Sequence, residues 1–124
     1  MIDFNQNTLF KLKQVETAKG EKMVEELLTD GERVLSAYRD VRDYVVFTDR
    51  RVISVNVENL TGKKRNYTVL PYAKISAYSV ETSGVGDIDS ELELWYSGLG
   101  RVRFEFSGSS DIRQIGRLIA TYTL

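Results

Sequence analysis

The side chains of this 124-residue sequence that could do chemistry are mostly charged, and they form a basic and an acidic group. Residues 50–65 hold five bases and one acid, and the bases are Arg50, Arg51, Lys63, Lys64 and Arg65. Residues 81–93 hold five acids and no base, and the acids are Glu81, Asp87, Asp89, Glu91 and Glu93. Opposite charges on one chain suit a head-to-tail contact between copies, which closes into a ring when the rotation allows it. We therefore predict that the acidic group of one subunit meets the basic group of the next.

The basic group is also the better of two candidate anion-binding sites. Three consecutive strand residues, 63–65, point to alternating faces, so they do not make one continuous patch. A solvated strand start that discourages edge pairing is the competing interpretation. The other candidate, the short loop 39–43, carries two carboxylates that would cancel its two guanidinium groups. Nucleic-acid binding is not expected, because it would need aromatic residues on the same face and only Tyr67 is nearby.

Residues 87–91 are rich in oxygen atoms and resemble part of a cation site. A calcium loop of the EF-hand kind needs further ligands and a glycine at its sixth position, where this sequence has Leu92. Glycosidase chemistry would need one carboxylic acid buried enough to hold its proton, and no pattern indicates that. We predict neither a metal nor a cofactor.

The composition excludes several classes of function. The sequence has no cysteine and no histidine, which removes disulfides, thiolate sites and the commonest general base and metal ligand. A formal net charge of -1 gives no overall attraction to nucleic acid or anionic lipid. Neither a signal-peptide pattern nor an apolar run of about 18 residues occurs. We expect a cytoplasmic protein without enzymatic activity, since no nucleophile, base and electrophile can be combined.

Apolar residues at helical spacing predict one or two amphipathic helical segments within residues 9–28, separated at Lys19 and Gly20. These residues are Leu9, Leu12, Val15, Val24, Leu27 and Leu28. Gly31 fits a helix end or a turn. We expect residues 1–30 to form an N-terminal helical extension to a main domain at residues 31–124.

From residue 33 the apolar period changes to two, which predicts about seven antiparallel strands. The expected strands cover residues 33–39, 42–48, 51–57, 63–70 and 74–82 and a hairpin within 91–106. In the hairpin, the apolar faces of the two strands lie on the same side, and cross-strand charge favours the register that places Glu93 opposite Arg103. Trp95 then lies opposite Arg101. Trp95 then lies on the charged face, either as an interface anchor or shielded by Arg101 or Arg103 through a cation-π contact.

An apolar stripe within residues 109–122 predicts one C-terminal helix with a serine and aspartate cap. The stripe consists of Ile112, Ile115, Ile119 and Tyr122. Strands followed by one amphipathic helix describe a mainly β (α+β) fold, a curled antiparallel sheet closed by the helix.

Five short motifs in this order resemble the bacterial pleckstrin-homology (PH-like) domain family. They are FTDRRVI at residues 47–53, LTGKK at 60–64, LPYAKI at 70–75, SVET at 79–82 and DIDSEL at 87–92. The resemblance covers residues 31–124 and implies a PH-like barrel of about seven strands capped by the C-terminal helix. It also implies a non-enzymatic family whose members self-associate, with ring-shaped homo-oligomers as the expected form.

We therefore expect a self-assembling module that acts as a protein-binding scaffold, with itself and an unidentified protein as partners. The expected subunit interface comprises Arg50, Lys63, Lys64, Arg65, Asp87, Asp89, Glu91, Glu93 and Trp95. The alternative is a binder of a small molecule or lipid headgroup at the membrane surface, although the charge balance does not favour membrane association.

Overall fold

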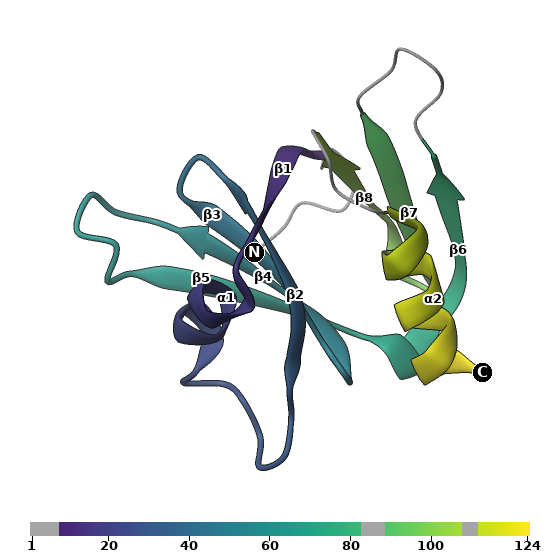
Figure 1. The fold of residues 1–124 in the computed structure, drawn as a ribbon, viewed down its shortest axis with the longest axis horizontal. Coiled ribbons are helices and arrows are strands. Elements are labelled where there is room, and N and C mark those ends of the chain that lie inside the picture. The colour runs from purple at the N-terminus through teal and green to yellow at the C-terminus, as the bar shows by residue number, and fades with distance from the viewer. Residues whose placement is uncertain (1–7, 83–88, 108–111) are drawn as a thin grey trace. The chain divides into compact units, whose positions relative to one another are not determined.

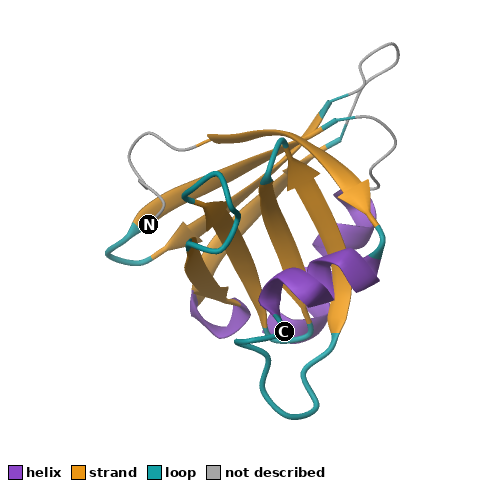
Figure 2. Ribbon diagram, turned by 90° about the vertical axis from the view of Figure 1, so that its left-hand side faces the viewer, coloured by secondary structure: helices purple, strands orange, loops and turns teal. Residues whose placement is uncertain are grey.

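The computed structural model describes residues 8–82, 89–107 and 112–124, which contain eight strands, two α-helices and one 3-10 helix. Strands make up most of this part of the chain (Figure 2). The residues cluster into two compact units. The first contains Gln14–Pro71, and the second contains Tyr72–Leu124 together with residues 8–13. No helix in the described ranges is long and apolar enough to span a membrane.

The first unit contains an antiparallel meander (Figure 1). Its strands are β2 (Val34–Asp40), β3 (Asp43–Thr48), β4 (Arg51–Val57) and β5 (Arg65–Pro71). Each strand pairs with the next along the chain, as the alternating apolar pattern predicts. These four strands confirm four of the predicted ones.

A helix, α1 (Thr17–Val24), packs on β2, β3 and β4 of this meander. Its contact forms a core of fully buried side chains, namely Val24, Ala37, Val46, Ile53 and Val55. Burying each of the valine and isoleucine side chains contributes about 1.5–3 kcal/mol, so this cluster fixes the helix on the sheet. A short N-terminal helix is thus confirmed.

The predicted break at Lys19 and Gly20 is wrong, because α1 continues through both residues. Gly20 is buried against β2, where an added Cβ would clash with the Cβ of Ala37. The glycine therefore serves close packing of helix on strand rather than ending the helix.

The helical expectation is also wrong for residues 9–15, which lie in a strand, β1 (Thr8–Val15). This strand runs parallel to β8 (Gly100–Phe106), with Leu9 paired to Phe104 and Leu12 to Phe106. Three residues on β1 thus match two on β8, and Lys11 between them has a φ of 55°. Such a bulge inserts one residue into the alternation. The resulting spacing of three between apolar residues imitates the helical period.

The remaining strands of the second unit form an antiparallel set with β8. They are β6 (Ile75–Glu81) and β7 (Ser90–Tyr96), and the 3-10 helix η1 (Tyr72–Lys74) precedes β6. Side chains along β7 alternate strictly between buried and half-buried. The register confirms the prediction, with Glu93 opposite Arg103 and Trp95 opposite Arg101.

The C-terminal helix α2 (Ile112–Thr123) packs on β6, β7 and η1. Ile112, Ile115 and Ile119 are buried as the predicted stripe requires. Tyr122, the fourth member, is 37% exposed and stacks on Tyr72 with a centroid distance of 6.1 Å. The predicted cap at residues 109–111 lies outside the described residues.

Candidate anion-binding site

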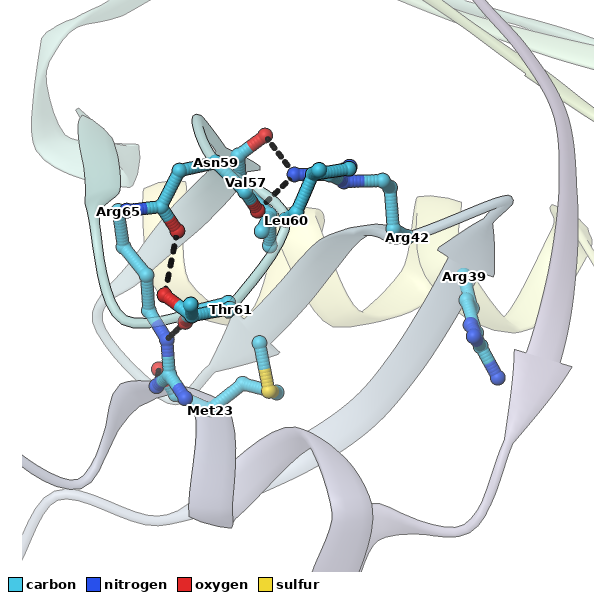
Figure 3. Close-up of a pocket in the computed structure, with 9 residues that line it drawn as sticks. Met23, Arg39, Arg42, Val57, Asn59, Leu60, Thr61 and Arg65 are labelled. Atoms are coloured by element: carbon cyan, nitrogen blue, oxygen red, sulfur yellow. Dashed lines mark hydrogen bonds between the residues drawn. The ribbon is translucent and has the colours of Figure 1, made fainter.

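A pocket of about 330 Å³ lies at one end of the first unit's meander. The β2–β3 and β4–β5 turns lie at this same end, because Asp40 pairs with Asp43, Tyr44 with Val55 and Val57 with Arg65 in the strand registers. The lining residues are Met23, Arg39, Arg42, Val57, Asn59, Leu60, Thr61, Gly62 and Arg65. In Figure 3, Asn59, Leu60, Thr61 and Arg65 lie at the β4–β5 turn and Arg42 reaches toward it, whereas Arg39 lies apart with its side chain directed away from that turn. Three of the nine lining residues are arginines.

Arg42 ties the two turns together. Its Nη2 donates to the backbone oxygen of Val57 at 3.2 Å and to that of Asn59 (Figure 3). The side chain is thereby held over the start of the β4–β5 turn, which reverses at Gly62 with a φ of 74°. The hydroxyl of Thr61 donates to Asn59 Oδ1 at 3.0 Å and stiffens the same turn.

Arg65 connects this turn to α1. Its Nε donates to the backbone oxygen of Gly62 at 3.1 Å, and its Nη1 donates to that of Met23 at 3.3 Å. Met23 lies in the last turn of α1, where backbone carbonyls lack partners within the helix. Arg65 is therefore half-buried and performs a structural task besides lining the pocket.

Arg39 is the most exposed of the three arginines. Its Nε donates to the backbone oxygen of Val41 at 2.7 Å, and its guanidinium carbon lies 5.7 Å from the ring centroid of Tyr44. A guanidinium group has five N–H donors, so each of the three arginines keeps donors for an anion.

No carboxylate lines the pocket among the described residues. The sequence had suggested that the acids of loop 39–43 cancel its arginines. Asp43 instead points to β4, where Oδ1 accepts from the amide of Val57 at 2.8 Å and Oδ2 from Asn56 Nδ2 at 3.3 Å. The pocket therefore has a local excess of positive charge that the sequence pattern concealed.

The structure divides the predicted basic group between two ends of the meander. Arg50 is exposed in the β3–β4 turn and donates to the hydroxyl of Thr29 at 3.5 Å. Lys63 and Lys64 are exposed in the β4–β5 turn, beside the pocket. Since the seven residues of β4 separate the two turns by roughly 20 Å, the basic group does not form a single patch.

Two of the five members of the predicted acidic group, Glu91 and Glu93, are paired with arginines of their own hairpin. Glu91 accepts two hydrogen bonds from Arg103, at 2.5 and 2.6 Å. These bonds raise the pKa of Arg103 above its usual range. Glu93 lies 3.7 Å from Arg101 and 3.9 Å from Arg103. The number of acidic residues in segment 81–93 therefore overstates the negative charge that this segment presents to a partner.

The other predicted interface residues differ in position. Asp89 is exposed, and Asp87 lies outside the described residues. Trp95 is half-buried on β7, between Ala77 of β6 and Arg101 of β8 in the register. It is thus less accessible than an exposed interface anchor would be.

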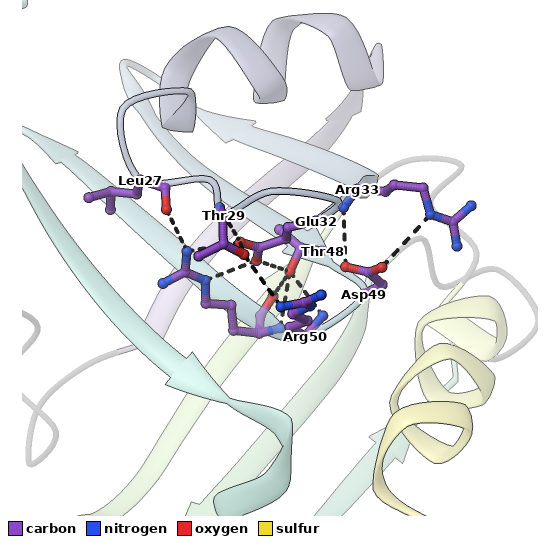
Figure 4. A network of polar contacts seen from close by, with 8 residues as sticks. Leu27, Thr29, Glu32, Arg33, Thr48, Asp49 and Arg50 are labelled. Carbon is purple, nitrogen blue, oxygen red and sulfur yellow. Dashed lines mark hydrogen bonds and ion pairs between the residues drawn. The ribbon is translucent and has the colours of Figure 1, made fainter.

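Sequence reasoning missed a buried carboxylate, Glu32, whose side chain is 0% exposed (Figure 4). Arg51 donates to it from Nε and Nη2, both at 2.9 Å, and also to the backbone oxygen of Leu27 at 2.7 Å. Thr48 Oγ1 donates to Glu32 at 2.7 Å, and the amide of Thr29 donates at 3.1 Å. Arg51 therefore belongs to the interior and not to an anion-binding surface.

The pKa of Glu32 reflects this network. Burial raises the pKa, but hydrogen bonds from Arg51, Thr48 and Thr29 and the charge of Arg51 outweigh that effect. Together they lower it from 4.5 to about 2. The carboxylate therefore stays charged at neutral pH and cannot serve as a proton donor there.

The family profile described as "Bacterial PH domain" matches residues 3–123. The chain belongs to the bacterial PH domain family. The match extends into the N-terminal segment, so it includes β1 and α1 as well as the motifs seen in the sequence.

Relatives of this bacterial PH domain support the assignment. It is 42% identical over 106 residues to the uncharacterized protein YjqA of Bacillus subtilis (strain 168), covering 84% of this chain and 85% of that one. A DUF1696 family protein with a pleckstrin-homology domain from Shewanella loihica PV-4 has a TM-score of 0.78 and 34% identity. That match covers 93% of this chain and 99% of the other. A pleckstrin homology domain from Shewanella amazonensis SB2B has a TM-score of 0.66 and 38% identity, over 89% and 90% of the two chains.

In this bacterial PH domain the motif at residues 47–53 has a structural role. Thr48 Oγ1 accepts from the amides of Arg50 and Arg51 at 3.0 and 3.1 Å and so closes the β3–β4 turn. Asp49 accepts from the amide of Arg33 at 3.1 Å on the neighbouring segment. The motif therefore fixes the fold, and the pocket at the other end of the strands is the better candidate for function.

Proposed function

We propose that this bacterial PH domain is a non-catalytic cytoplasmic binding module that holds an anionic ligand in the pocket of Arg39, Arg42 and Arg65. The observation that carries the proposal is that three arginines line one cavity without a lining carboxylate in the described chain. Guanidinium groups match the geometry of phosphate and carboxylate oxygens, so an anion bearing phosphate is the best fit.

The lining also favours binding over catalysis. Among the described lining residues a hydroxyl occurs only on Thr61, and that group already donates to Asn59. A general base does not accompany it among the lining residues that the structure describes. Without an activated nucleophile, the pocket can hold and orient an anion but offers no route to transform it.

Calorimetric titration with inorganic pyrophosphate tests the pocket. Replacing Arg39 with glutamine should weaken binding by about 10-fold or more, because a hydrogen bond to a charged group contributes about 1.5–3 kcal/mol. Arg39 is the suitable arginine, since it is the most exposed of the three and its side-chain contacts, to the backbone oxygen of Val41 and the ring of Tyr44, stay beside the β2–β3 turn. The matched control is Arg117→Gln, at an exposed position on α2, which should bind as the wild type does. Equal affinities of the Arg39 and Arg117 variants, or no saturable binding by the wild type, would refute the pocket.

Self-assembly as a protein-binding scaffold is the second candidate, and the strand order favours it. That order ends at β5 and β6, which pair in the described residues only with β4 and β7 respectively. An edge strand can pair with a strand of another copy, and a head-to-tail arrangement of such contacts can form a ring. Acidic residues near the end of β6 and the start of β7 would then meet Lys63 and Lys64, which precede β5.

Light scattering of charge reversals tests this assembly. Asp89→Lys and Lys64→Glu should each lower the molar mass, and the double variant should restore it if the two positions face each other. We choose Asp89 because it is an exposed member of the predicted acidic group. Glu25→Lys, at an exposed position in α1's C-cap, serves as the control. Single variants that assemble like the wild type would argue against the charged contact.

A further inference from the structure

The strand β6 is an edge of the second unit, and its sequence leaves that edge open. Among the described residues β6 pairs with β7 alone, so one side of its backbone faces no strand there. Edge strands are normally protected by basic side chains or proline. The other edge strand, β5, has both, with Lys63 and Lys64 before it, Arg65 at its start and Pro71 at its end. The sequence of β6, ISAYSVE, contains neither a basic residue nor a proline.

A groove of about 350 Å³ lies beside this edge, between β6 and α2. We call it the α2–β6 groove, and its lining residues are Ile75, Ser76, Ala77, Tyr78, Thr123 and Leu124. The helix runs antiparallel to the strand, with its C-terminal end beside the start of β6 (Figure 1). Near the end of β6 the two elements are in close contact, because a Cβ added at Gly116 would lie 3.1 Å from Val80 Cγ2. The space between helix and strand therefore widens toward the C-terminal end of α2.

A bulge shapes the strand side of the α2–β6 groove. Ile75 and Ala77 pair with adjacent residues of β7, so Ser76 between them is an extra residue. Ile75 and Tyr78 therefore lie on the same face of the sheet, although they are three residues apart, and both are half-buried. Ser76 and Ala77 are small and exposed, so they leave room for a side chain from outside the chain.

The helix side of the groove favours a positive charge. The last carbonyl groups of a helix lack partners within it and form the negative end of its dipole. The last turn of α2 contains no basic residue that would offset this charge. The exposed Lys74 and Glu81, which adjoin the two ends of the strand, offset each other. A ligand that combines an apolar side chain with a nearby basic one is therefore complementary to the groove.

We propose that the α2–β6 groove binds an extended peptide of a partner protein, which pairs with β6 as an added strand and places an apolar side chain against Ile75 and Tyr78. In such a complex the backbone hydrogen bonds supply affinity and the groove supplies specificity. A second copy of the chain is the competing occupant, but its β5 carries the bases and Pro71 that limit strand pairing. The groove belongs to the second unit and the arginine pocket to the first, so the peptide site is independent of the proposed anion site.

Selection from a displayed library of random peptides, with the full chain as bait, tests the groove. We expect the selected peptides to contain a large apolar residue close to a lysine or arginine, and one of them, once synthesised, is the probe for calorimetry. Ser76→Arg should weaken its binding by about 10-fold or more, because the new side chain occupies the space of one apolar ligand side chain and repels a basic one. The matched control is Gln114→Arg, at an exposed position of α2 that does not line the groove, which should bind as the wild type does.

The backbone of the probe provides a second test, which side-chain contacts alone would not pass. Only every second N–H group of an added strand faces its neighbour. N-methylation of one alternating set of amides in the peptide should therefore abolish binding, whereas methylation of the other set should be tolerated. Hydrogen exchange at the amides of β6 should also slow when the unmodified peptide binds.

Several outcomes would overturn the peptide site. They are a selection that yields no binding peptide, equal binding by Ser76→Arg and Gln114→Arg, and equal tolerance of the two methylation patterns. Slower exchange at β6 that increases with protein concentration in the absence of peptide would assign this edge to a second copy instead. An unchanged urea unfolding transition of Ser76→Arg would show that its loss of binding is not a loss of folding.

Discussion

Replacing Arg51 with leucine is expected to lower the free energy of unfolding by about 3–5 kcal/mol, the usual cost of removing one partner from a buried ion pair. The partner left behind is Glu32, whose side chain is 0% exposed and receives two hydrogen bonds of 2.9 Å from Arg51. The backbone oxygen of Leu27 would lose its donor as well. A charged carboxylate would then remain in the interior with only threonine and amide donors.

Urea unfolding followed through the fluorescence of Trp95, the single tryptophan, measures this loss. Arg50→Leu is the matched control, because Arg50 is the exposed neighbour and surface substitutions usually change stability by no more than about 0.5 kcal/mol. The double variant Arg51→Leu/Glu32→Leu should recover most of the loss, since it leaves no unpaired charge. Equal destabilisation by Arg50→Leu and Arg51→Leu would contradict the assigned role.

Most strands of this fold could be predicted from the spacing of their apolar residues, which alternates most clearly in β7 and β8. In the β7–β8 hairpin the alternation and the charges of Glu93 and Arg103 sufficed to predict the register. In this hairpin the side chains alternate between the two faces of each strand, and contacts with the rest of the fold do not change that alternation. The resemblance of residues 47–92 to the bacterial PH domain family then supplied the fold, which the relatives confirm.

The N-terminal segment could not be predicted in the same way, because two local signals there have non-local causes. The bulge at Lys11 alters the spacing of apolar residues in β1, and its cause is the pairing with β8. Gly20 resembles a break in the sequence, whereas its role is close contact with Ala37. Both explanations depend on strands distant in the sequence.

The arginine pocket was missed for a related reason. Arg39 and Arg42 are separated in sequence from Arg65, and only the meander brings their turns together. The hydrogen-bond partner of Asp43 could not be predicted either, because a carboxylate in a turn can bind its own backbone, a neighbouring strand or a nearby guanidinium group. In the structure it accepts from the amide of Val57 on β4. Counting charges within a segment therefore underestimated the positive charge of this site.

The same counting overestimated the acidic group. Residues 81–93 contain no base, yet Arg101 and Arg103 reach Glu91 and Glu93 from the opposite strand. The predicted register already implied this proximity, so the sequence contained the signal. A charge survey is therefore more informative after strand pairing than along the linear chain.

Acidification is expected to remove about 3 kcal/mol of stability through Glu32, which is the free energy that corresponds to a pKa lowered from 4.5 to about 2. Because the folded-state pKa lies below that of the unfolded chain, the contribution is fully present above pH 4.5. It decreases as the pH falls from 4.5 toward 2, since the unfolded chain takes up the proton first.

Urea unfolding of the wild type and of Glu32→Gln at several pH values isolates this contribution from that of the exposed carboxylates. The variant should be less stable at neutral pH, because Arg51 then lacks its charged partner, but its stability should depend less on pH below 4.5. The difference between the two proteins should therefore decrease on acidification. Parallel pH profiles would mean that Glu32 titrates alike in the folded and unfolded states, which the hydrogen bonds from Arg51, Thr48 and Thr29 should prevent.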